Sequence, residues 1–389
     1  MSLRLALISG PAYDQLYERL PEFERQAGVK VEVVFRAPHP QLNERLAHEY
    51  AEGSATYDLV STHTKYAPSQ AHWLLPLDEW IGDAEQSAFF PGIVELSRIN
   101  GRLMQVPRCV DARMLHFRSD WFAEAGVATP STWEQFRTAA IRFTSPPNRY
   151  GTTFPGRHSG LFGTWYELLA MAGGDLFDAE LRPAFLGEAG EWALAFLHDL
   201  HAVSQVTPRD LPSGHYEEVA ACFRQGRCAM ILEWPGYYGL LRRGDDTTVE
   251  GRFGLERYPV GPAGFRKVYS GAHSFAIPTS VRHRAEALAL LRFLTSEDSQ
   301  VVQGLAGDIV PRLSAWQKIK KSSASDPLDA RRMELLEATM REDMLIPPKF
   351  PRYPAVEDAL WTALQAGVTG AVPVRQALEQ ADRKIREIL

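Results

Sequence analysis

The segment around Pro107 constrains the fold of this chain more than any other segment. Residues 103–106 predict a short apolar strand that stops at Pro107, because proline has no backbone N–H to donate to a neighbouring strand. An apolar run resumes at residues 114–117, and the polar Arg108 and Asp111 lie between the two runs. Two strands without a helix between them are expected where a chain passes from one lobe to another. We therefore predict a hinge crossing here, with a ligand cleft beside Arg108 and Asp111.

The length of 389 residues favours two domains, because single hydrophobic cores rarely grow beyond about 250–300 residues. Hydrophobic residues make up 45% and charged residues 23%, which is ordinary for a soluble globular protein. The formal net charge of −6 argues against binding to nucleic acid, which needs a basic face. No apolar run approaches the roughly 20 residues of a membrane span. The start of the chain has an apolar run but no small-residue cleavage site, so we expect any export signal to lie outside this sequence.

The N-terminal third alternates predicted strands with predicted helices. Strands are expected at residues 5–8, 29–35 and 57–60, with helices between them. This order predicts an α/β domain with a largely parallel sheet, and the ligands of such sheets bind beyond the carboxyl ends of the strands. The predicted ends are residues 9–13, 62–64 and 108–111.

Further along the chain, short strands follow longer helical stretches. Thr132, or the serine before it, can cap a helix in a capping-box pattern. Residues 228–232 predict a buried strand that ends at the polar and aromatic segment 233–237, and residues 274–277 predict another strand. Residues 318–332 carry a lysine cluster, serines and an Asp-Pro pair, so we interpret them as a solvated linker.

The three cysteines, Cys109, Cys222 and Cys228, have no metal-ligand spacing, and we predict no metal site and no cofactor. Cys222 and Cys228 could pair in an oxidising compartment. We favour the alternative that they are two small buried apolar side chains, because free cysteine is among the most buried residue types.

The sequence contains none of the common catalytic or nucleotide-binding motifs. G-x-S-x-G, H-E-x-x-H, the phosphate-binding loop and G-x-G-x-x-G are all absent. We therefore predict no catalytic residue and no enzymatic activity. A pair of carboxylates in a cleft could in principle hydrolyse a glycosidic bond, so a glycosidase stays open as an alternative.

Four blocks of sequence together resemble one family, the bacterial extracellular solute-binding proteins of the type that includes maltose-binding protein. Their order and spacing, which extend over most of the chain, carry the resemblance. The first block is 57–60 (YDLV) with 73–78 (WLLPLD), and the second is 106–107 (VP), 117–122 (FRSDWF), 125–127 (AGV), 130–133 (PSTW) and 150–151 (YG). The third is 223–230 (FRQGRCAM), and the fourth is 258–262 (YPVGP), 270–271 (SG), 276–278 (AIP) and 293–296 (FLTS).

The resemblance implies an α/β, two-lobed periplasmic-binding-protein fold of type II, with discontinuous lobes around a hinge. Chain crossings are expected near Arg108, Ser270 and Trp316. The expected lobes are residues 1–109 with 272–315 and residues 110–271 with 316–389. The resemblance also implies capture of an extracytoplasmic solute, foremost a sugar or oligosaccharide, and its delivery to the membrane permease of an ABC importer by hinge closure. We expect a periplasmic or extracellular monomer, with a lipid anchor as one form of attachment.

A sugar offers hydroxyls and apolar C–H faces, so its site needs aromatic surfaces and fixed hydrogen-bond partners, since each unpaired buried polar group costs about 1–3 kcal/mol. In the family an aromatic residue follows the third block, but the order of Trp, Pro and Gly is altered here, so either Trp234 or Tyr237 could stack. Arg108 and Asp111 could hold hydroxyls or form a structural ion pair. The expected ligand-binding residues are Tyr13, His63, Arg108, Asp111, Arg157, His158, Glu233, Trp234, Tyr237, His273, Phe350, Arg352 and Tyr353.

An anionic solute, such as a sugar phosphate, a sugar acid or a glycerophosphodiester, is the alternative for the same fold. Arginine pairs bidentately with carboxylate and phosphate, and the expected lining is unusually cationic for a neutral sugar. Its cationic members are Arg108, Arg157, His158, His273 and Arg352.

Overall fold

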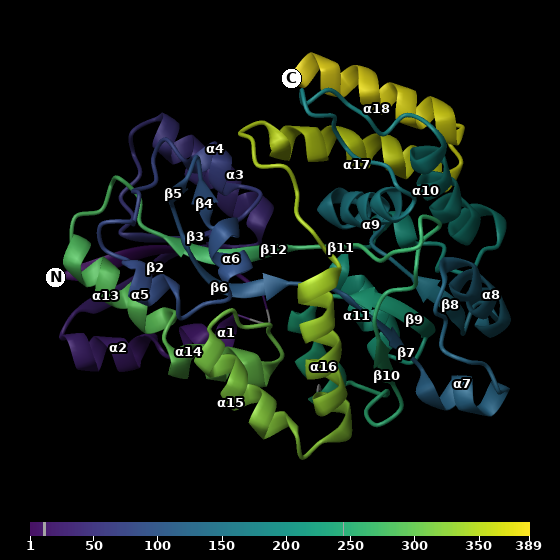
Figure 1. The fold of residues 1–389 in the computed structure, drawn as a ribbon, viewed down its shortest axis with the longest axis horizontal. Helices are drawn as coiled ribbons and strands as arrows, with labels where there is room; N and C mark the ends of the chain where they lie inside the picture. The colour runs from purple at the N-terminus through teal and green to yellow at the C-terminus, as the bar shows by residue number, and fades with distance from the viewer. Residues whose placement is uncertain (11–12, 244) are drawn as a thin grey trace. The chain divides into compact units, whose positions relative to one another are not determined.

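The computed structural model describes residues 1–10, 13–243 and 245–389, and these residues divide into two compact units, each with its own sheet (Figure 1). Each unit is assembled from separate stretches of chain. Unit 1 comprises Met1–Asp111, Gly271–Ala330 and Pro347–Tyr353. Unit 2 comprises Ala112–Ser270, Arg331–Ile346 and Pro354–Leu389.

These bounds differ from the expected lobes mainly near the C-terminus, where residues 316–330 and 347–353 belong to unit 1. Helix α15 (Leu313–Ser323) packs on α14 (Glu297–Ala306), and Ile319 lies so close to Gly304 that a Cβ there would clash with it. The Lys349 Nζ donates hydrogen bonds to the backbone oxygens of Glu95 at 2.7 Å and Arg98 at 3.1 Å. These contacts explain the assignment of both stretches to unit 1.

Unit 1 contains a five-stranded sheet in the order β2-β1-β3-β12-β6. β1 pairs in parallel with β2 and β3, whereas β12 pairs antiparallel with β3 and β6. β6 therefore runs in the same direction as the first three strands, and the predicted parallel sheet of the N-terminal third is confirmed. The strands are β1 (Ser2–Ile8), β2 (Lys30–Ala37), β3 (Leu59–His63), β6 (Val106–Asp111) and β12 (Gly271–Ala276).

Alternation along β1 explains why both faces of this sheet are covered. Leu3, Leu5 and Leu7 belong to one core cluster, and Ala6 and Ile8 belong to another, because successive side chains of a strand point to opposite faces. Unit 1 also contains α1 (Asp14–Tyr17), α2 (Leu20–Ala27), α3 (His39–Ala51), α4 (Ala67–Gln70), α5 (Asp83–Gln86), α6 (Pro91–Leu96), β4 (Arg98–Ile99), β5 (Arg102–Leu103) and α13 (Arg284–Leu294).

The strand around Pro107 is longer than the sequence predicts. Pro107 lies inside β6 instead of ending a strand, and Arg108 and Asp111 belong to the same strand. The register against β12 shifts here, and Arg108 is the extra residue between the paired Pro107 and Cys109, which makes it a β-bulge. β6 is an edge strand of the sheet, where proline is tolerated. The predicted break is therefore a bulge, and the chain leaves unit 1 only after Asp111.

Unit 2 contains a four-stranded sheet in the order β10-β7-β9-β8. β9 pairs in parallel with β8 and antiparallel with β7. The strands are β7 (Met114–Phe117), β8 (Tyr150–Thr153), β9 (Cys228–Glu233) and β10 (Gly254–Glu256), and a separate pair joins β11 (Val268–Tyr269) to β13 (Met344–Leu345). The helices that lie mainly in unit 2 are α7 (Ser119–Ala125), α8 (Trp133–Phe143), α9 (His158–Met171), α10 (Glu188–His198), α11 (Tyr216–Arg224), α12 (Tyr238–Arg243), α16 (Pro327–Glu342), α17 (Tyr353–Thr369) and α18 (Val374–Ile388). Single helical turns lie at Asp199–Val203, Leu211–Ser213 and Pro235–Tyr237.

Two local predictions have opposite outcomes. Thr132 caps α8 as predicted, because its side-chain oxygen accepts a hydrogen bond from the Gln135 backbone N–H at 3.3 Å. At residues 318–332 the predicted linker is wrong, because most of this stretch belongs to α15 and α16, but its solvated character is confirmed, since most of its residues are exposed or half-buried. Arg332 is buried there, with its guanidinium carbon 4.4 Å from the centre of the Tyr238 ring.

Cys222 and Cys228 form a disulfide, with their Cα atoms 6.0 Å apart. The favoured interpretation of two separate thiols is therefore wrong. The chain reverses between α11 and β9 at Gly226, whose φ of 70° is a left-handed conformation that glycine adopts without strain. This reversal brings the two cysteines together. Cys109 is a buried free cysteine of unit 1.

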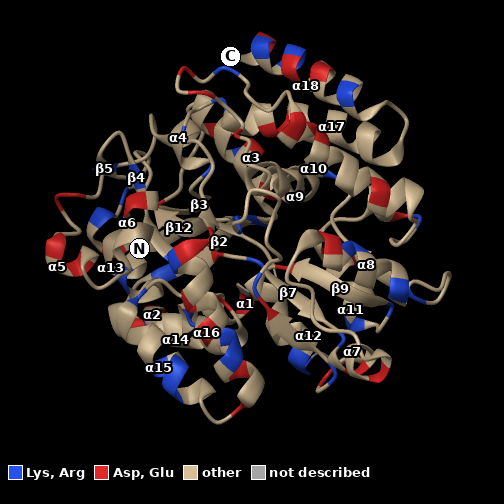
Figure 2. Cartoon of the chain, turned by 45° about the vertical axis from the view of Figure 1, so that its right-hand side comes forward, with Lys and Arg blue, Asp and Glu red and all other residues tan. Residues whose placement is uncertain are grey.

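Basic and acidic side chains are interspersed along the surface helices, as α18 shows in Figure 2. There the Arg386 Nε donates to a carboxylate oxygen of Asp382 at 2.9 Å, one turn earlier. Among the described residues, no helix combines the length and the apolar character needed to cross a membrane.

Candidate functional site

One edge of the unit 1 sheet gathers polar and aromatic side chains. β1, β2, β3 and β6 run in the same direction, so their carboxyl ends meet at this edge, and β12 begins there. Tyr13 and His39 follow β1 and β2, while His63 and Asp111 end β3 and β6. His273 lies near the start of β12, directly opposite His63. The topology thus brings together residues from five separate parts of the sequence.

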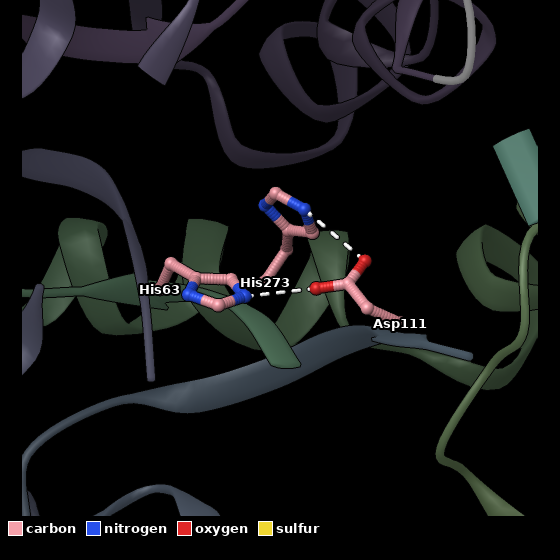
Figure 3. A group of neighbouring side chains, drawn as sticks. All are labelled: His63, Asp111 and His273. Atoms are coloured by element: carbon pink, nitrogen blue, oxygen red, sulfur yellow. Dashed lines mark hydrogen bonds and ion pairs between the residues drawn. The ribbon is translucent and has the colours of Figure 1, made fainter. Parts of the chain in front are cut away.

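Asp111 is in contact with two histidines (Figure 3). Its Oδ2 lies 2.8 Å from Nε2 of His63, and its Oδ1 lies 3.3 Å from Nε2 of His273. The Lys65 backbone N–H donates to Nδ1 of His63 at 3.2 Å, so Nε2 of that ring carries the proton and donates to Asp111. Gly271 permits this approach, because a Cβ at its position would lie 2.7 Å from Nε2 of His63.

Arg108 stacks on aromatic rings of unit 1 and does not pair with Asp111. Its guanidinium carbon lies 4.0 Å from the centre of the Tyr13 ring and 5.6 Å from that of Phe275. The side chain is completely buried, and none of its three guanidinium nitrogens has a hydrogen-bond partner among the described residues. The hydroxyl of Tyr13 lies 3.2 Å from Nε2 of His273. Tyr13 therefore links the arginine to the histidine cluster, and the structural ion pair with Asp111 is not formed.

His39 completes this cluster, with its Nε2 2.8 Å from Nδ1 of His273. Burial lowers the pKa of His273 to about 4 and holds the pKa of His39 well below its usual value, so both rings are neutral at pH 7. Burial alone would raise the pKa of Asp111, but the neighbouring His273 and His63 keep it below the usual range of a carboxyl. The edge therefore presents one carboxylate among imidazoles that can donate and accept hydrogen bonds.

Unit 2 has its own cluster at the edge where β9 ends and β7 begins. Met114, the first residue of β7, pairs with Glu233, the last residue of β9. The guanidinium carbon of Arg113, just before β7, lies 4.9 Å from the centre of the Trp234 ring system. Tyr216 of α11 meets the same indole edge-on, with 5.7 Å between ring centres. Trp234 is half-buried, so an aromatic surface is held here between a cation and a second aromatic ring.

Arg113 is fixed by Glu167 of α9. Its Nε donates to Oε1 of Glu167 at 3.2 Å, and its second terminal nitrogen donates to Oε2. The Tyr269 backbone N–H at 2.8 Å and the Tyr258 hydroxyl at 3.3 Å also donate to this carboxylate. Burial raises the pKa of Glu233 to about 8, and its Oε2 has no hydrogen-bond partner. Glu233 is therefore protonated at pH 7 and can donate a hydrogen bond.

The other predicted residues of unit 2 lie in two places. Tyr237 ends the short helical turn that follows Trp234, and it is half-buried. Arg157 precedes α9 and is half-buried, whereas His158 is exposed, with its ring centre 4.6 Å from that of Trp361 in α17. The structure therefore brings Trp234 and Tyr237 together with Glu233, while His158 packs on a neighbouring helix.

The remaining predicted residues belong to unit 1. Phe350 and Tyr353 are buried and their ring centres lie 5.8 Å apart, while Arg352 between them is exposed. Phe350 and Tyr353 therefore pack against each other. Pro11 and Ala12, at the predicted end of the first strand, lie outside the described residues.

Sequence reasoning missed four members of the two clusters. His39 directly follows β2, so the rule used for the other strand ends, applied to this strand, could have found it. Arg113 and Glu167 lie 54 positions apart, and nothing local in the sequence indicates that they pair. Tyr216 is an ordinary residue at a helix start. Long-range packing alone reveals these three.

The fold has counterparts among solved structures. Maltose-bound MalE3 of T. maritima matches with a TM-score of 0.91 and 23% identity, covering 100% of both chains. The ABC transporter solute-binding protein of Agrobacterium vitis S4 with bound D-mannitol matches with a TM-score of 0.85 and 20% identity, covering 100% of this chain and 98% of that one. This chain has the two-lobed type II periplasmic-binding-protein fold, and the predicted fold class is confirmed.

The family follows from the sequence. The family model of the bacterial extracellular solute-binding proteins matches residues 8–301, so this chain belongs to that family. The mannitol-binding protein of Pseudomonas aeruginosa is 24% identical over 368 residues, which cover 88% of this chain and 82% of that protein. The predicted family is thereby confirmed. Its members and the structural counterparts are substrate-binding proteins.

Proposed function

We propose that this protein captures a neutral sugar or sugar alcohol outside the cytoplasm and delivers it to the permease of an ABC importer. The observation that carries the proposal is the polar cluster at the unit 1 sheet edge, where Asp111, His63 and His273 lie together at strand ends. The relatives support the solute class, because they include proteins named or solved with mannitol and maltose. The family supports the role in transport.

The two clusters suit the two kinds of surface that a sugar presents. Asp111 accepts hydrogen bonds, and the imidazole of His273, neutral at pH 7, offers both a donor and an acceptor atom, as a hydroxyl requires. In unit 2, the half-buried face of Trp234 suits the apolar C–H face of a sugar ring, and protonated Glu233 can donate to an oxygen. Each cluster by itself thus offers one kind of contact that a sugar needs.

A neutral solute fits unit 1 better than an anionic one. His273 is neutral at pH 7, and Asp111 carries a negative charge at the centre of the cluster. Two cations lie nearby, Arg108 over the Tyr13 ring and the Lys65 ammonium 4.9 Å from the centre of the Tyr66 ring. An anion would meet the Asp111 carboxylate at short range, and like charges repel strongly where burial reduces screening. Of the five expected cations, His158 packs on Trp361.

We further propose that the protein binds without turnover and works in the periplasm or at the cell surface. Two buried carboxyls of the unit 2 cluster have raised pKa values, about 8 for Glu233 and about 7 for Glu167. Glu167 is already bound by Arg113, whereas a glycosidase needs two carboxyl groups that face the same bond. The family supports the extracytoplasmic location. A chromogenic glycoside panel checks the first point, and sustained product release that is lost in Glu233→Gln would contradict it.

A thermal-shift screen followed by calorimetry tests the proposed solute class. We expect stabilisation by one or more of mannitol, ribitol, tagatose, maltose and longer maltodextrins, with about 2.7 kcal/mol at a solute concentration of 100 Kd. Mass spectrometry should recover the solute unchanged. Gluconate and glucose 6-phosphate serve as anionic probes, and binding of these alone, or of nothing in the panel, would overturn the proposal.

Variants then locate the site. Asp111→Asn should reduce the affinity for the solute about 10-fold or more, because a hydrogen bond to a charged group contributes about 1.5–3 kcal/mol. Asp78→Asn is the matched control, because Asp78 also binds two basic side chains of unit 1 but lies outside the cluster. Arg98 donates a hydrogen bond to it at 3.2 Å and Arg102 at 3.0 Å. The control should keep the parent affinity.

A further inference from the structure

Three neighbouring strands of unit 1 place two histidines and one aspartate within reach of a single point. β12 lies between β3 and β6, so His273 faces His63 on one side, and Gly271 faces Asp111 on the other. With no side chain on Gly271, the His63 ring extends across this position to the aspartate. One ligand atom from each of His63, Asp111 and His273 lies within 4.8 Å of the others. Among the described residues, this is the one group of its kind.

We propose that His63, Asp111 and His273 bind a divalent transition-metal ion, with zinc as the reference case. Two imidazole nitrogens and a carboxylate oxygen form a donor set that such ions prefer, at metal–ligand distances of about 2.0–2.2 Å. Donor atoms around a tetrahedral ion at that distance lie about 3.3–3.6 Å apart. At present His63 and His273 lie 2.8 Å and 3.3 Å from different oxygens of Asp111, and the three ligand atoms lie within 4.8 Å of one another, so binding draws them toward a common point. The sequence analysis predicts no metal site, and this proposal departs from it.

The surroundings of His273 support a role as a ligand. At present Nε2 of His273 faces the Asp111 carboxylate, so it carries the proton and Nδ1 accepts from Nε2 of His39 at 2.8 Å. When a metal binds to Nε2, this hydrogen bond reverses: Nδ1 of His273 carries the proton and donates to Nε2 of His39, whose own proton moves to Nδ1 and opens the 3.4 Å contact with the Asn43 amide. A metal-binding histidine usually has such a partner, which fixes its tautomer and its orientation. The two rings are also stacked, with 4.7 Å between their centres. Tyr13, whose hydroxyl lies 3.2 Å from Nε2 of His273, stands on the side from which an ion would approach.

Binding changes the hydrogen bonds of His63. At present its Nε2 proton is donated to Asp111, and its Nδ1 accepts from the Lys65 backbone N–H at 3.2 Å. A metal on Nε2 takes the place of that proton, which moves to Nδ1, so the hydrogen bond from Lys65 opens. Two hydrogen bonds of His63, to Asp111 and from Lys65, are exchanged for a metal–nitrogen bond. Three protein ligands leave at least one coordination position for water or for a solute hydroxyl.

Metal uptake by the intact, chelator-treated protein tests the proposal without any solute. Zn²⁺ is titrated in competition with a chromophoric chelator, and Co²⁺ is added separately as a spectroscopic probe. We expect one equivalent of Zn²⁺ per chain, and Co²⁺ absorption bands that report nitrogen and oxygen ligands in a shell of four or five. His63→Gln, His273→Gln and Asp111→Asn should each weaken uptake at least about 10–100-fold.

Two kinds of variant keep this test decisive. His72→Gln is the matched control, because His72 is an exposed histidine of the same unit, and it should leave uptake unchanged. His39→Gln keeps all three ligands but changes the partner of His273, so it should weaken uptake by about 10-fold or more without abolishing the Co²⁺ bands. Circular dichroism identifies any variant that does not fold. No tight equivalent of Zn²⁺ in the parent, or the same uptake in all three ligand variants, would overturn the proposal, and sugar binding could still stand.

Discussion

The guanidinium carbon of Arg108 lies 4.0 Å from the centre of the Tyr13 ring, and within the described part of the chain the guanidinium nitrogens have no hydrogen-bond partner. The side chain is nevertheless completely buried. A buried charge without hydrogen bonds usually destabilises a fold, because the lost hydration is not replaced. Arg108 is also the extra residue of the bulge in β6, so the local backbone is adapted to it. This combination suggests a residue that serves ligand binding more than stability.

Replacing Arg108 by methionine should leave the free energy of unfolding unchanged or raise it by about 1–3 kcal/mol, because an apolar side chain needs no hydrogen-bond partner there. The affinity for the solute should fall about 10-fold or more, since a charged hydrogen bond is lost. Denaturant unfolding and calorimetry measure the two effects. Arg45→Met, which removes an exposed guanidinium 4.4 Å from the Phe35 ring, is the control. Lower stability with full affinity would show that Arg108 is structural.

Trp234→Ala should reduce the affinity for the solute about 10-fold or more, because an aromatic face and its buried area are lost together. Trp80→Ala is the matched control. Both indoles are half-buried beside an arginine: the guanidinium carbon of Arg113 lies 4.9 Å from the ring centre of Trp234, and that of Arg284 lies 5.0 Å from the ring centre of Trp80. Trp80, however, packs against the core of unit 1. The control should lower the melting temperature and keep the affinity. If Trp234→Ala binds the solute as tightly as the parent does, Trp234 does not contact the solute.

Glu233→Gln should make the protein more stable at high pH. Burial raises the pKa of Glu233 from 4.5 to about 8 in the folded state. The protonated carboxyl contributes its full stability below pH 4.5, and this contribution is lost as the pH rises toward 8. The glutamine cannot ionise, so the variant should exceed the parent by about 1–3 kcal/mol at pH 8 and lose this advantage near pH 4.

Urea unfolding between pH 4 and pH 8.5 measures this difference. Glu124→Gln, at an exposed position of α7, is the control and should follow the parent at every pH. A difference that does not change with pH would mean that Glu233 is ionised, or otherwise solvated, in the folded protein.

Reduction of the disulfide should destabilise unit 2. The bond joins Cys222 and Cys228, which are 6 positions apart. Closing a loop of this size stabilises the folded protein by about 2 kcal/mol, because the cross-link lowers the entropy of the unfolded chain. Dithiothreitol should therefore lower the melting temperature by a few degrees. In the double variant Cys222→Ser/Cys228→Ser the reductant should have no further effect, although the buried thiol of Cys109 remains. An equal response of the parent and the double variant would contradict this assignment.

Much of the fold could be predicted because its signals are local. The apolar runs of β1, β3, β7 and β9 and the cap at Thr132 depend on neighbouring residues, and they lie where the sequence predicts them. Pro107 misled the prediction, because only the position of β6 at the sheet edge makes a proline tolerable inside the strand. Residues 318–332 misled it as well, because the burial of Arg332 on Tyr238 is not visible in a polar composition.

The candidate site could be predicted only in part. The rule that ligands lie beyond strand ends found His63 and Asp111, and the resemblance to the family pointed to His273 and Trp234. The rule could not show that Asp111 would contact both histidines instead of Arg108, because this depends on the register of β12 against β3 and β6. Whether these residues bind the solute stays a prediction for the experiments above.

The central place of β12 in the unit 1 sheet affects the order in which the molecule can form. β12 lies between β3 and β6 although it follows β6 by some 160 residues of chain, most of which build unit 2. A nascent chain that ends before Gly271 therefore has β6 without its partner strand, and β3 with one side open. Such unpaired edges attract other chains. The first half of this protein should consequently depend on chaperones during synthesis until the later strand has emerged.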